Sequence, residues 1–285
     1  MKKAIISDQL SMDFEEALFR VKDRFEYIEI HSLWNKTVEE LDDTEIHEVE
    51  KLLKKYRMHV SCLSTTLFLM CPLYTDVDCL EKFSDKFLVF IGDIDDHVEC
   101  LQKCIEMGER LNTEYIRIFP FRLEEKATKD FNVYLRDMAE KLQTAVGIAE
   151  KGKKCLIIEN CPHSYLPRGN MTFELARQIN SNRVMLLYDI GNSFSSQNYQ
   201  YPEEFKKDSL LDEYNKIKEK VTYFHFKDYM KNNNGFQHAA FGEGDVGFTN
   251  LYEVIKMDDN DKVISLEPEV DAEGVEISIQ NMLAL

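Results

Sequence analysis

Four side chains that could bind a metal ion or move a proton stand near the ends of apolar runs in the second half of the chain. Glu159 lies in KCLIIEN, Asp189 in RVMLLYDI, His225 in VTYFHFKD and Glu267 in KVISLEPE. Such an oxygen-rich set with one imidazole suits Mn²⁺, Mg²⁺ or Co²⁺, and it could hold Zn²⁺ with positions left open for substrate oxygens. Without a cation, clustered carboxylates would repel one another and their pKa values would rise.

A glycine-rich stretch offers a competing interpretation of the same region. Residues 242–247 read GEGDVG, the G-x-G-x-x-G spacing of dinucleotide-binding loops, and Glu267 follows 20 positions after the last glycine. A dinucleotide loop, however, lies directly between a strand and a helix in an early βαβ unit. Here 13 residues separate the apolar run that ends near Asp228 from the first glycine. We therefore interpret the glycines as a loop over a pocket, with its amides and Glu243 as candidate substrate contacts.

Strand-like and helix-like segments alternate along the whole chain and must position these side chains. The strand-like runs are 2–7, 25–32, 59–65, 114–120, 154–160, 183–190, 221–228 and 262–269. The helix candidates are 13–24, 44–57, 96–112, 130–151, 172–180, 203–219, 248–257 and 273–283. Eight strands, each followed by a helix, predict a (β/α)8 TIM barrel in which the polar side chains meet at the carboxyl ends of the strands.

The sequence predicts a single domain over residues 1–285. Neither a linker rich in Pro, Gly or Ser nor a change in composition divides the chain. The connection over 66–93 is too long for a simple turn between a strand and a helix. Loops of that length beside a barrel mouth usually carry an inserted helix, a lid or a subunit contact.

Charge and cysteine usage exclude several classes of partner. With 35 basic and 52 acidic residues the formal charge is -17, which opposes binding to nucleic acid or to anionic membranes. The N-terminal stretch has only a short apolar run, unlike a signal peptide, and no apolar run approaches a membrane span. Seven cysteines form an odd set without a C-x-x-C pair. We expect reduced thiols and a cytoplasmic protein.

Five short motifs carry a family resemblance. They are LIIEN at 156–160, YDIGN at 188–192, FHFKD at 224–228, FGEGDVGF at 241–248 and SLEPE at 265–269. In this order they resemble the xylose isomerase-like sugar phosphate isomerase/epimerase family. The DIGN and GEGxVxF forms look most like its ketose 3-epimerases, which include the L-ribulose-5-phosphate 3-epimerases. The match lies chiefly in the last four strands.

The resemblance implies a divalent metal, with Mn²⁺ as the first choice, bound by Glu159, Asp189, His225 and Glu267. It also implies that the two glutamates serve as acid and base on a sugar or sugar phosphate. One would remove the proton beside the ketose carbonyl to give a metal-stabilised cis-enediolate, and the other would return a proton with inverted configuration. A homodimer or homotetramer is expected from the habits of such relatives and from the long 66–93 loop.

Three polar residues near these motifs are further candidates for substrate binding. Asn192 stands where many relatives carry His, and its amide can donate a hydrogen bond to a substrate hydroxyl but cannot carry a proton. Lys227 could bind a substrate oxygen or phosphate, or it could pair with Asp228. His163 could orient substrate or join a second metal, or it could be an ordinary loop histidine.

Residues of the first half of the chain could complete the pocket. Arg117 lies on the fourth run, and Glu29 and His31 end the second run. These side chains either line the floor of the pocket or pair with one another. His97 and His238 have no motif around them, and we expect both at the surface.

Three other functions remain open at the level of the sequence. The first is a dehydratase on the same scaffold, such as one acting on an inosose. The second is a non-catalytic sugar-binding barrel. The third is an abasic-site endonuclease of the same barrel superfamily, which needs more histidines at strand ends than this chain has and which the charge of -17 opposes.

Overall fold

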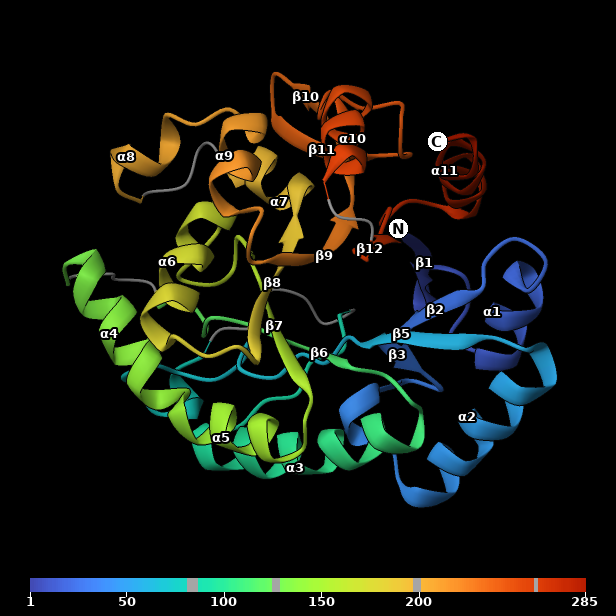
Figure 1. Ribbon diagram of the computed structural model, residues 1–285, viewed down its shortest axis with the longest axis horizontal. Helices are drawn as coiled ribbons and strands as arrows, with labels where there is room; N and C mark the ends of the chain where they lie inside the picture. Colours follow the sequence, from blue (N-terminus) through green and yellow to red (C-terminus); the bar gives the residue numbers. More distant parts are fainter. Residues whose placement is uncertain (81–86, 125–128, 197–200, 259–260) are drawn as a thin grey trace.

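Eight parallel strands close into a barrel in the computed structural model, which describes residues 1–80, 87–124, 129–196, 201–258 and 261–285 (Figure 1). The barrel strands are β1 (Lys2–Ile6), β2 (Tyr27–Ile30), β5 (His59–Leu63), β6 (Tyr115–Ile118), β7 (Cys155–Glu159), β8 (Val184–Asp189), β9 (Val221–Phe226) and β12 (Val263–Leu266). Their order around the ring is β1-β12-β9-β8-β7-β6-β5-β2. The predicted (β/α)8 barrel is confirmed.

Helices surround the strands on the outside of the ring (Figure 1). They are α1 (Phe14–Val21), α2 (Asp43–Tyr56), α3 (Ile94–Arg110), α4 (Phe131–Lys141), α5 (Gln143–Lys151), α6 (Gly169–Ile179), α7 (Ile190–Ser195), α8 (Glu203–Lys206), α9 (Leu210–Ile217), α10 (Phe248–Met257) and α11 (Ala272–Ala284). Aspartates begin many of them: Asp13, Asp42, Asp93 and Asp271 each accept a hydrogen bond from an amide of the first turn. No helix in the described ranges is long and apolar enough to cross a membrane.

Two of the predicted helices are each a pair of shorter ones. The candidate over 130–151 is interrupted at Leu142, whose amide bonds to Glu140 and Met138 in a tightened turn between α4 and α5. The candidate over 203–219 begins again at Ser209, because the Ser209 hydroxyl accepts from the Asp212 amide and caps α9. The short helix α7, directly after Asp189, was not expected from the sequence.

Alternation along the strands places the candidate ligands inside the barrel. Successive strand residues point alternately inward and toward the helices. The inward apolar layer consists of Ala4, Cys62, Cys155, Ile157, Leu187, Tyr223 and Val263. Glu159, Asp189 and His225 each stand two residues after a member of this layer, and Glu267 stands four residues after Val263. They therefore form the next layer up, at the carboxyl ends of the strands.

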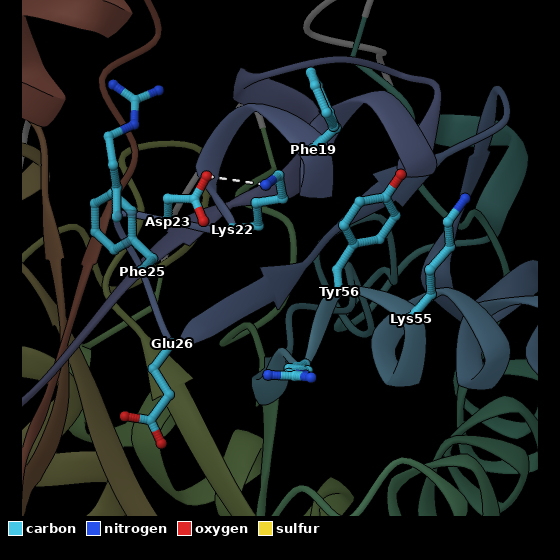
Figure 2. A pocket seen from close by; sticks show the side chains of 9 residues that line it. Phe19, Lys22, Asp23, Phe25, Glu26, Lys55 and Tyr56 are labelled. Carbon is cyan, nitrogen blue, oxygen red and sulfur yellow. Dashed lines mark hydrogen bonds and ion pairs between the residues drawn. The ribbon is translucent and has the colours of Figure 1, made fainter.

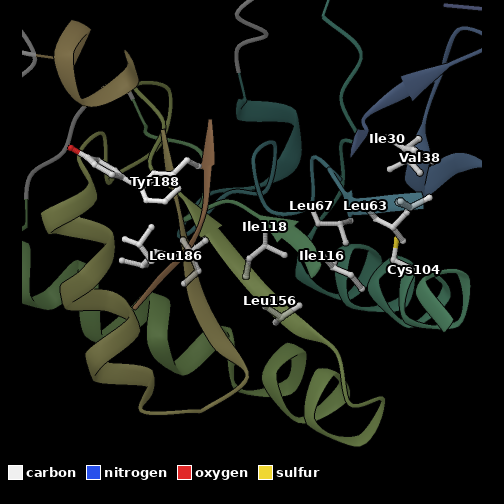
Figure 3. Packing of buried hydrophobic residues seen from close by; sticks show 14 of the residues in the cluster. Ile30, Val38, Leu63, Leu67, Cys104, Ile116, Ile118, Leu156, Leu186 and Tyr188 are labelled. Carbon is white, nitrogen blue, oxygen red and sulfur yellow. The ribbon is translucent and has the colours of Figure 1, made fainter. Parts of the chain in front are cut away.

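The outward residues of the same strands fill the larger core between barrel and helices. Ile116, Ile118, Leu156 and Leu186 belong to this cluster and lie along adjacent strands in Figure 3. Cys104, from α3, packs into the same cluster. Burying this apolar surface holds the strand ends at fixed positions, which a precise site requires.

Two hairpins interrupt the simple alternation of strands and helices. The small one pairs β3 (Ser32–Leu33) with β4 (Lys36–Thr37). The larger one pairs β10 (Asp228–Asn232) with β11 (Gly235–Ala239), where Gly235 turns the chain with a φ of 118°. Neither β10 nor β11 was among the strand-like runs predicted from the sequence, and the polar turn KNNNG lies at the tip of this hairpin.

The described part of the 66–93 connection packs onto the barrel through buried apolar residues such as Leu67 and Phe68. His97 on α3, expected at the surface, is fully buried beneath it. The Phe68 amide donates to His97 Nδ1 at 3.0 Å, and the two rings stack at 5.3 Å. Burial lowers the pKa of His97 to about 4, so a neutral imidazole holds the loop. Residues 81–86 of this predicted loop lie outside the described ranges.

A buried ion pair outside the barrel yields the first prediction. Arg168 and Glu213 are both buried, and Arg168 Nε donates to Glu213 Oε2 at 3.1 Å. We expect Arg168→Met to lower the free energy of unfolding by about 3–5 kcal/mol, because it leaves a buried carboxylate unpaired. Urea denaturation measures this loss.

The exposed pair of Arg177 and Glu174 supplies the control. Arg177→Met should cost at most about 1 kcal/mol, because water already solvates both partners. Adding Glu213→Leu to Arg168→Met should recover only part of the stability, because Glu213 also accepts from the Asn170 amide and from Ser193 Oγ. Equal losses for Arg168→Met and Arg177→Met would contradict this interpretation.

Candidate metal centre and its pocket

The structure brings Glu159, Asp189, His225 and Glu267 together at the mouth of the barrel. All four side chains are buried, and one ligand atom from each lies within 4.8 Å of the others. The lateral register explains part of this convergence, because Asp189 on β8 is paired directly with His225 on β9. A single cation could therefore contact all four.

The orientation of His225 fits a metal ligand. Its Nε2 lies 2.9 Å from Glu29 Oε1, while its Nδ1 faces Glu159 Oε1 at 3.5 Å and Glu267 Oε2 at 3.2 Å. A carboxylate that holds one ring nitrogen leaves the other available to a metal. Asp189 Oδ2, His225 Nδ1 and Glu267 Oε2 are also buried, and their close contacts are ion pairs with one another or with Lys227 rather than hydrogen bonds. These atoms and their oxygen-rich surroundings fit a divalent cation.

Burial and mutual repulsion shift the proton affinities of this cluster. Burial, together with the charges of Glu267 and Glu159, raises the pKa of Asp189 to about 7 despite the nearby Lys227. Burial disfavours a charged His225, yet the neighbouring carboxylates raise the pKa of this imidazole well above its ordinary value. Protons thus occupy the site at neutral pH when no cation does.

Two permanent cations partly balance the carboxylates. Arg117 Nη1 lies 3.0 Å from Glu159 Oε2, and the other guanidinium nitrogens donate to the carbonyls of Thr65 and Ser64. Lys227 Nζ lies 2.6 Å from Glu267 Oε2 and 3.3 Å from Asp189 Oδ2. The buried carboxylates here are Glu29, Glu159, Asp189 and Glu267. Four carboxylates less two cations leave two negative charges, the number that one divalent ion carries.

Asn160 fixes the backbone of one candidate ligand. Its Oδ1 accepts from the Asp189 amide at 2.9 Å, and its Nδ2 donates to the Asp189 carbonyl at 2.9 Å. Asn192 ties this unit to the neighbouring strand, because its Nδ2 donates to the Asn160 carbonyl at 3.0 Å and lies 3.4 Å from Glu159 Oε1. The two amides hold Glu159 and Asp189 in one rigid arrangement.

A pocket of about 860 Å³ opens above the cluster. The predicted site residues that line it are Arg117, Glu159, His163, Asn192, Lys227 and Glu267. Phe87, Phe119, Tyr229 and Phe236 supply aromatic surface to its walls. Carboxylates, an amide and aromatic rings around one cavity are a combination that suits a polyhydroxylated ligand.

His163 and Glu243, two of the predicted substrate contacts, differ in their position relative to the pocket. His163 lines the pocket, and burial with the nearby charges of Arg122 and Lys227 lowers its pKa to about 4, so it is neutral. Glu243 is exposed on the glycine loop and is not among the described residues that line this pocket. Contact of each with substrate stays a prediction.

The Asp228 carboxylate holds the glycine loop over 242–247 in its conformation. Its carboxylate accepts from the amides of Gly242 at 2.9 Å, Gly244 at 3.1 Å and Val246 at 3.3 Å. A Cβ on Gly244 would meet Asp228 Oδ1 at 2.2 Å, so the loop needs glycine there. Three amides expected to face substrate therefore hold Asp228, and Lys227 pairs with other carboxylates rather than with Asp228.

Several residues that line the pocket were not predicted from the sequence. Asp8 and Glu269 follow β1 and β12, so the rule that polar residues gather at strand ends could have found them. His238 was expected at the surface, but it lines the pocket and its Nε2 lies 3.1 Å from Glu269 Oε2. It comes from β11, and the unpredicted hairpin concealed it. Glu29 and His31 do not pair with each other: Glu29 holds His225, and His31 contacts Asp8.

A second hollow, of about 830 Å³, lies at the opposite end of the barrel (Figure 2). It is formed where α1 leads into β2 and where α2 ends. Lys22 pairs with Asp23 at 2.9 Å beside the exposed ring of Phe19. This end holds the amino termini of the strands, which in barrels of this kind contributes to stability rather than to chemistry.

Comparison with known proteins identifies the family. Residues 21–285 match the sequence profile described as xylose isomerase-like TIM barrel. The chain belongs to this family. Over 175 residues it is 27% identical to an uncharacterized protein of Methanocaldococcus jannaschii, a match that covers 60% of this chain and 56% of that protein.

Solved structures of low sequence identity share the family fold. A D-tagatose 3-epimerase-like protein superposes with a TM-score of 0.72 at 19% identity, over 100% of this chain and 97% of that one. The probable 3-DHS dehydratase AsbF of Bacillus anthracis gives 0.69 at 12% identity, over 99% and 98%. The IOLI protein with a zinc atom gives 0.67 at 15% identity, over 100% and 94%. At these identities the likeness shows the fold alone.

Metal binding by this family member should depend on pH. A cation needs Asp189 ionised and His225 neutral, and both groups have a raised pKa, so binding must displace their protons. We expect the apparent dissociation constant for Mn²⁺ to fall at least about tenfold per unit as pH rises from about 6 to about 7. Calorimetric titration in several buffers measures the affinity and the protons released. An affinity independent of pH would contradict the assignment.

Asn160 should control metal affinity without contacting the metal. Asn160→Asp would place a carboxylate oxygen against the Asp189 carbonyl, and we expect about 10- to 100-fold weaker Mn²⁺ binding. Asn281→Asp is the control, because Asn281 Nδ2 donates to the carbonyl of Phe241 outside the pocket lining. Equal effects of the two substitutions on Mn²⁺ affinity would rule out the positioning role.

Proposed function

We propose that the protein is a divalent-metal-dependent isomerase of a sugar or sugar phosphate, with 3-epimerisation of a ketose as its reaction. The observation that carries this proposal is that Glu159 and Glu267 both lie close to His225 and to Arg117. His225 Nδ1 lies 3.5 Å from Glu159 and 3.2 Å from Glu267, and Arg117 Nη1 lies 3.0 and 3.8 Å from them. β8 and β9 separate the strands of the two glutamates. They can therefore approach a substrate from different sides.

Proton transfer at the carbon beside the carbonyl needs one base and one acid. In this proposal one of Glu159 and Glu267 is ionised and removes the proton, while the other starts in its protonated form and returns a proton on the opposite face. The configuration is inverted, and the two glutamates end with their protonation states exchanged. A cation bound by the four candidate ligands would supply Lewis-acid stabilisation of the negative charge that develops on the substrate oxygens. Asn192 and Lys227 line the same pocket and are proposed to bind substrate oxygens.

The surrounding charges prepare a carboxylate for this role. Burial disfavours the ionised form of Glu267, but Lys227, His225 and Arg117 together hold the pKa of its carboxyl well below the ordinary value. Arg117 also fixes the Glu159 carboxylate through Nη1. The Glu267 carboxylate is thus ionised and fixed in position, as a general base must be, while its lowered pKa reduces its basicity.

Three further properties are part of this proposal. A cytoplasmic location is supported by free thiols at every cysteine of the chain. Mn²⁺ is the favoured cation, with Mg²⁺, Co²⁺ and Zn²⁺ as alternatives, because carboxylates dominate the donor set. A homodimer or homotetramer stays a prediction from the sequence.

Solvent deuterium tests the proposed reaction. The Mn²⁺-loaded protein, incubated with candidate ketoses in D₂O, should place deuterium on the carbon beside the carbonyl. Glu159→Gln and Glu267→Gln should each slow this exchange by about 100- to 10,000-fold, because a neutral amide cannot accept the proton. NMR of the recovered sugar measures the exchange.

Glu253→Gln is the matched control, since Glu253 is exposed on α10, and it should exchange at the unaltered rate. Persistent exchange in both active-site variants would overturn the assignment of the two glutamates. A product whose mass is lower by one water would instead identify a dehydratase. This alternative is retained because the probable 3-DHS dehydratase AsbF has a similar fold.

A further inference from the structure

A second polar group lies across the barrel mouth from Asp189. His31 follows β2, the strand opposite β8 in the eight-stranded ring, and Asp8 follows β1 beside it. Both side chains line the pocket above the candidate metal centre. His31 is buried, and Asp8 is only 18% exposed, so neither is an ordinary surface residue.

Both residues direct an unsatisfied polar atom into their buried surroundings. His31 Nδ1 lies 3.2 Å from Asp8 Oδ2 and 2.7 Å from Ser32 Oγ, while His31 Nε2 and Asp8 Oδ1 are buried without a hydrogen bond. Such atoms have no hydrogen-bond partner within the protein, and in a pocket either water or a ligand hydroxyl can supply one. The ring of Phe87, 5.2 Å from that of His31, adds an apolar surface beside them.

Glu269 links this group to the metal centre. Its backbone amide donates to Gln9 Oε1 at 2.8 Å, and Gln9 is the neighbour of Asp8 in the sequence. Its carboxylate lies 3.3 Å from Lys227 Nζ on one side and 3.1 Å from His238 Nε2 on the other. His238 Nδ1 is a further buried atom without a hydrogen bond. The wall between the two groups thus offers carboxylates and imidazoles.

The charge of this wall selects against a phosphate. Among the described lining residues, fixed positive charge comes from Arg117 and Lys227, and both already face carboxylates. The carboxylates that line the pocket are Asp8, Glu159, Glu267 and Glu269. A phosphate only accepts hydrogen bonds at neutral pH and would be repelled by Asp8. A hydroxyl can donate to Asp8 and can donate or accept at His31, whichever tautomer is present.

We propose that Asp8 and His31 form a subsite for a hydroxyl at the end of the sugar remote from the metal centre, so that the substrate is an uncharged sugar rather than a sugar phosphate. This inference rests on the proposed function for the orientation of the sugar. It narrows the substrate class that the family resemblance left open. Asp8 and His31 bind in this scheme and take no part in proton transfer.

Matched sugar pairs test the subsite by binding, independently of any reaction. Calorimetric titration of the Mn²⁺-loaded protein would compare ribulose with ribulose 5-phosphate, xylulose with xylulose 5-phosphate, and fructose with fructose 6-phosphate. At least one free sugar should bind at least about tenfold more tightly than its phosphate, because the Asp8 carboxylate repels a phosphate placed against it. Added salt should strengthen binding of the phosphate, because it screens the repulsion.

Substitutions assign the effect to the two residues. Asp8→Asn and His31→Gln should each weaken binding of the free sugar about tenfold. Asp8→Asn should also reduce the ratio between the affinity for the free sugar and the affinity for its phosphate. Asp95→Asn and His47→Gln, exposed positions on α3 and α2, are the matched controls and should change neither value. In the exchange assay the two subsite variants should raise KM and leave kcat nearly unchanged, a split that general destabilisation would not produce.

The outcomes separate the two proposals. Tighter binding of the phosphates, equal binding within each pair, failure of every free sugar to bind, or unchanged binding in Asp8→Asn would overturn the subsite. Tighter binding of a free sugar without deuterium exchange would support the subsite and overturn the isomerase. Exchange confined to a sugar phosphate would support the isomerase and overturn the subsite.

Discussion

Repulsion among four buried carboxylates at the carboxyl ends of the barrel strands is the constraint on which the site depends. Glu29, Glu159, Asp189 and Glu267 share a space from which bulk water is largely excluded, and isolated charges there would be costly. Arg117 and Lys227 offset two of the charges. Protons on Asp189 and His225, or one divalent cation, would offset the rest. Metal binding in this account is an exchange of protons for a cation within a fixed frame.

The fold fixes that frame through hydrogen bonds to backbone groups. The Asn160 side chain hydrogen-bonds to the amide and the carbonyl of Asp189, and the Asp228 carboxylate accepts from amides of the glycine loop. Ser193 lies 3.2 Å from Asn160 Nδ2 and 3.2 Å from Glu213 Oε1, so the buried ion pair outside the barrel supports the same unit. Ligand geometry therefore depends on residues that lie well away from the metal centre.

Sequence alone could predict the barrel and the four candidate ligands, because both follow from short-range regularities. Apolar runs of strand length repeat eight times, and inward positions recur every second residue, so a polar residue at the end of a run falls at the barrel mouth. The same rule would have found Asp8. Its position directly after the first run carries the same signal as that of Glu159 near the end of the fifth.

Other parts of the site depend on contacts that no local pattern reveals. The hairpin that brings His238 over the pocket has no long apolar run, and its short strands flank a polar turn, so the sequence also suits a loop. Lys227 stands next to Asp228 in the sequence, yet strand alternation sends the two side chains apart, one to the metal centre and one to the glycine loop. Such partners are set by tertiary packing rather than by spacing.

Anomalous diffraction from crystals of the protein grown with one equivalent of Mn²⁺ tests the central claim most directly. The account predicts a single strong anomalous peak in contact with Glu159, Asp189, His225 and Glu267, with Nδ1 as the imidazole ligand. An anomalous map without a peak among these four residues, or with its strongest peak elsewhere, would contradict it.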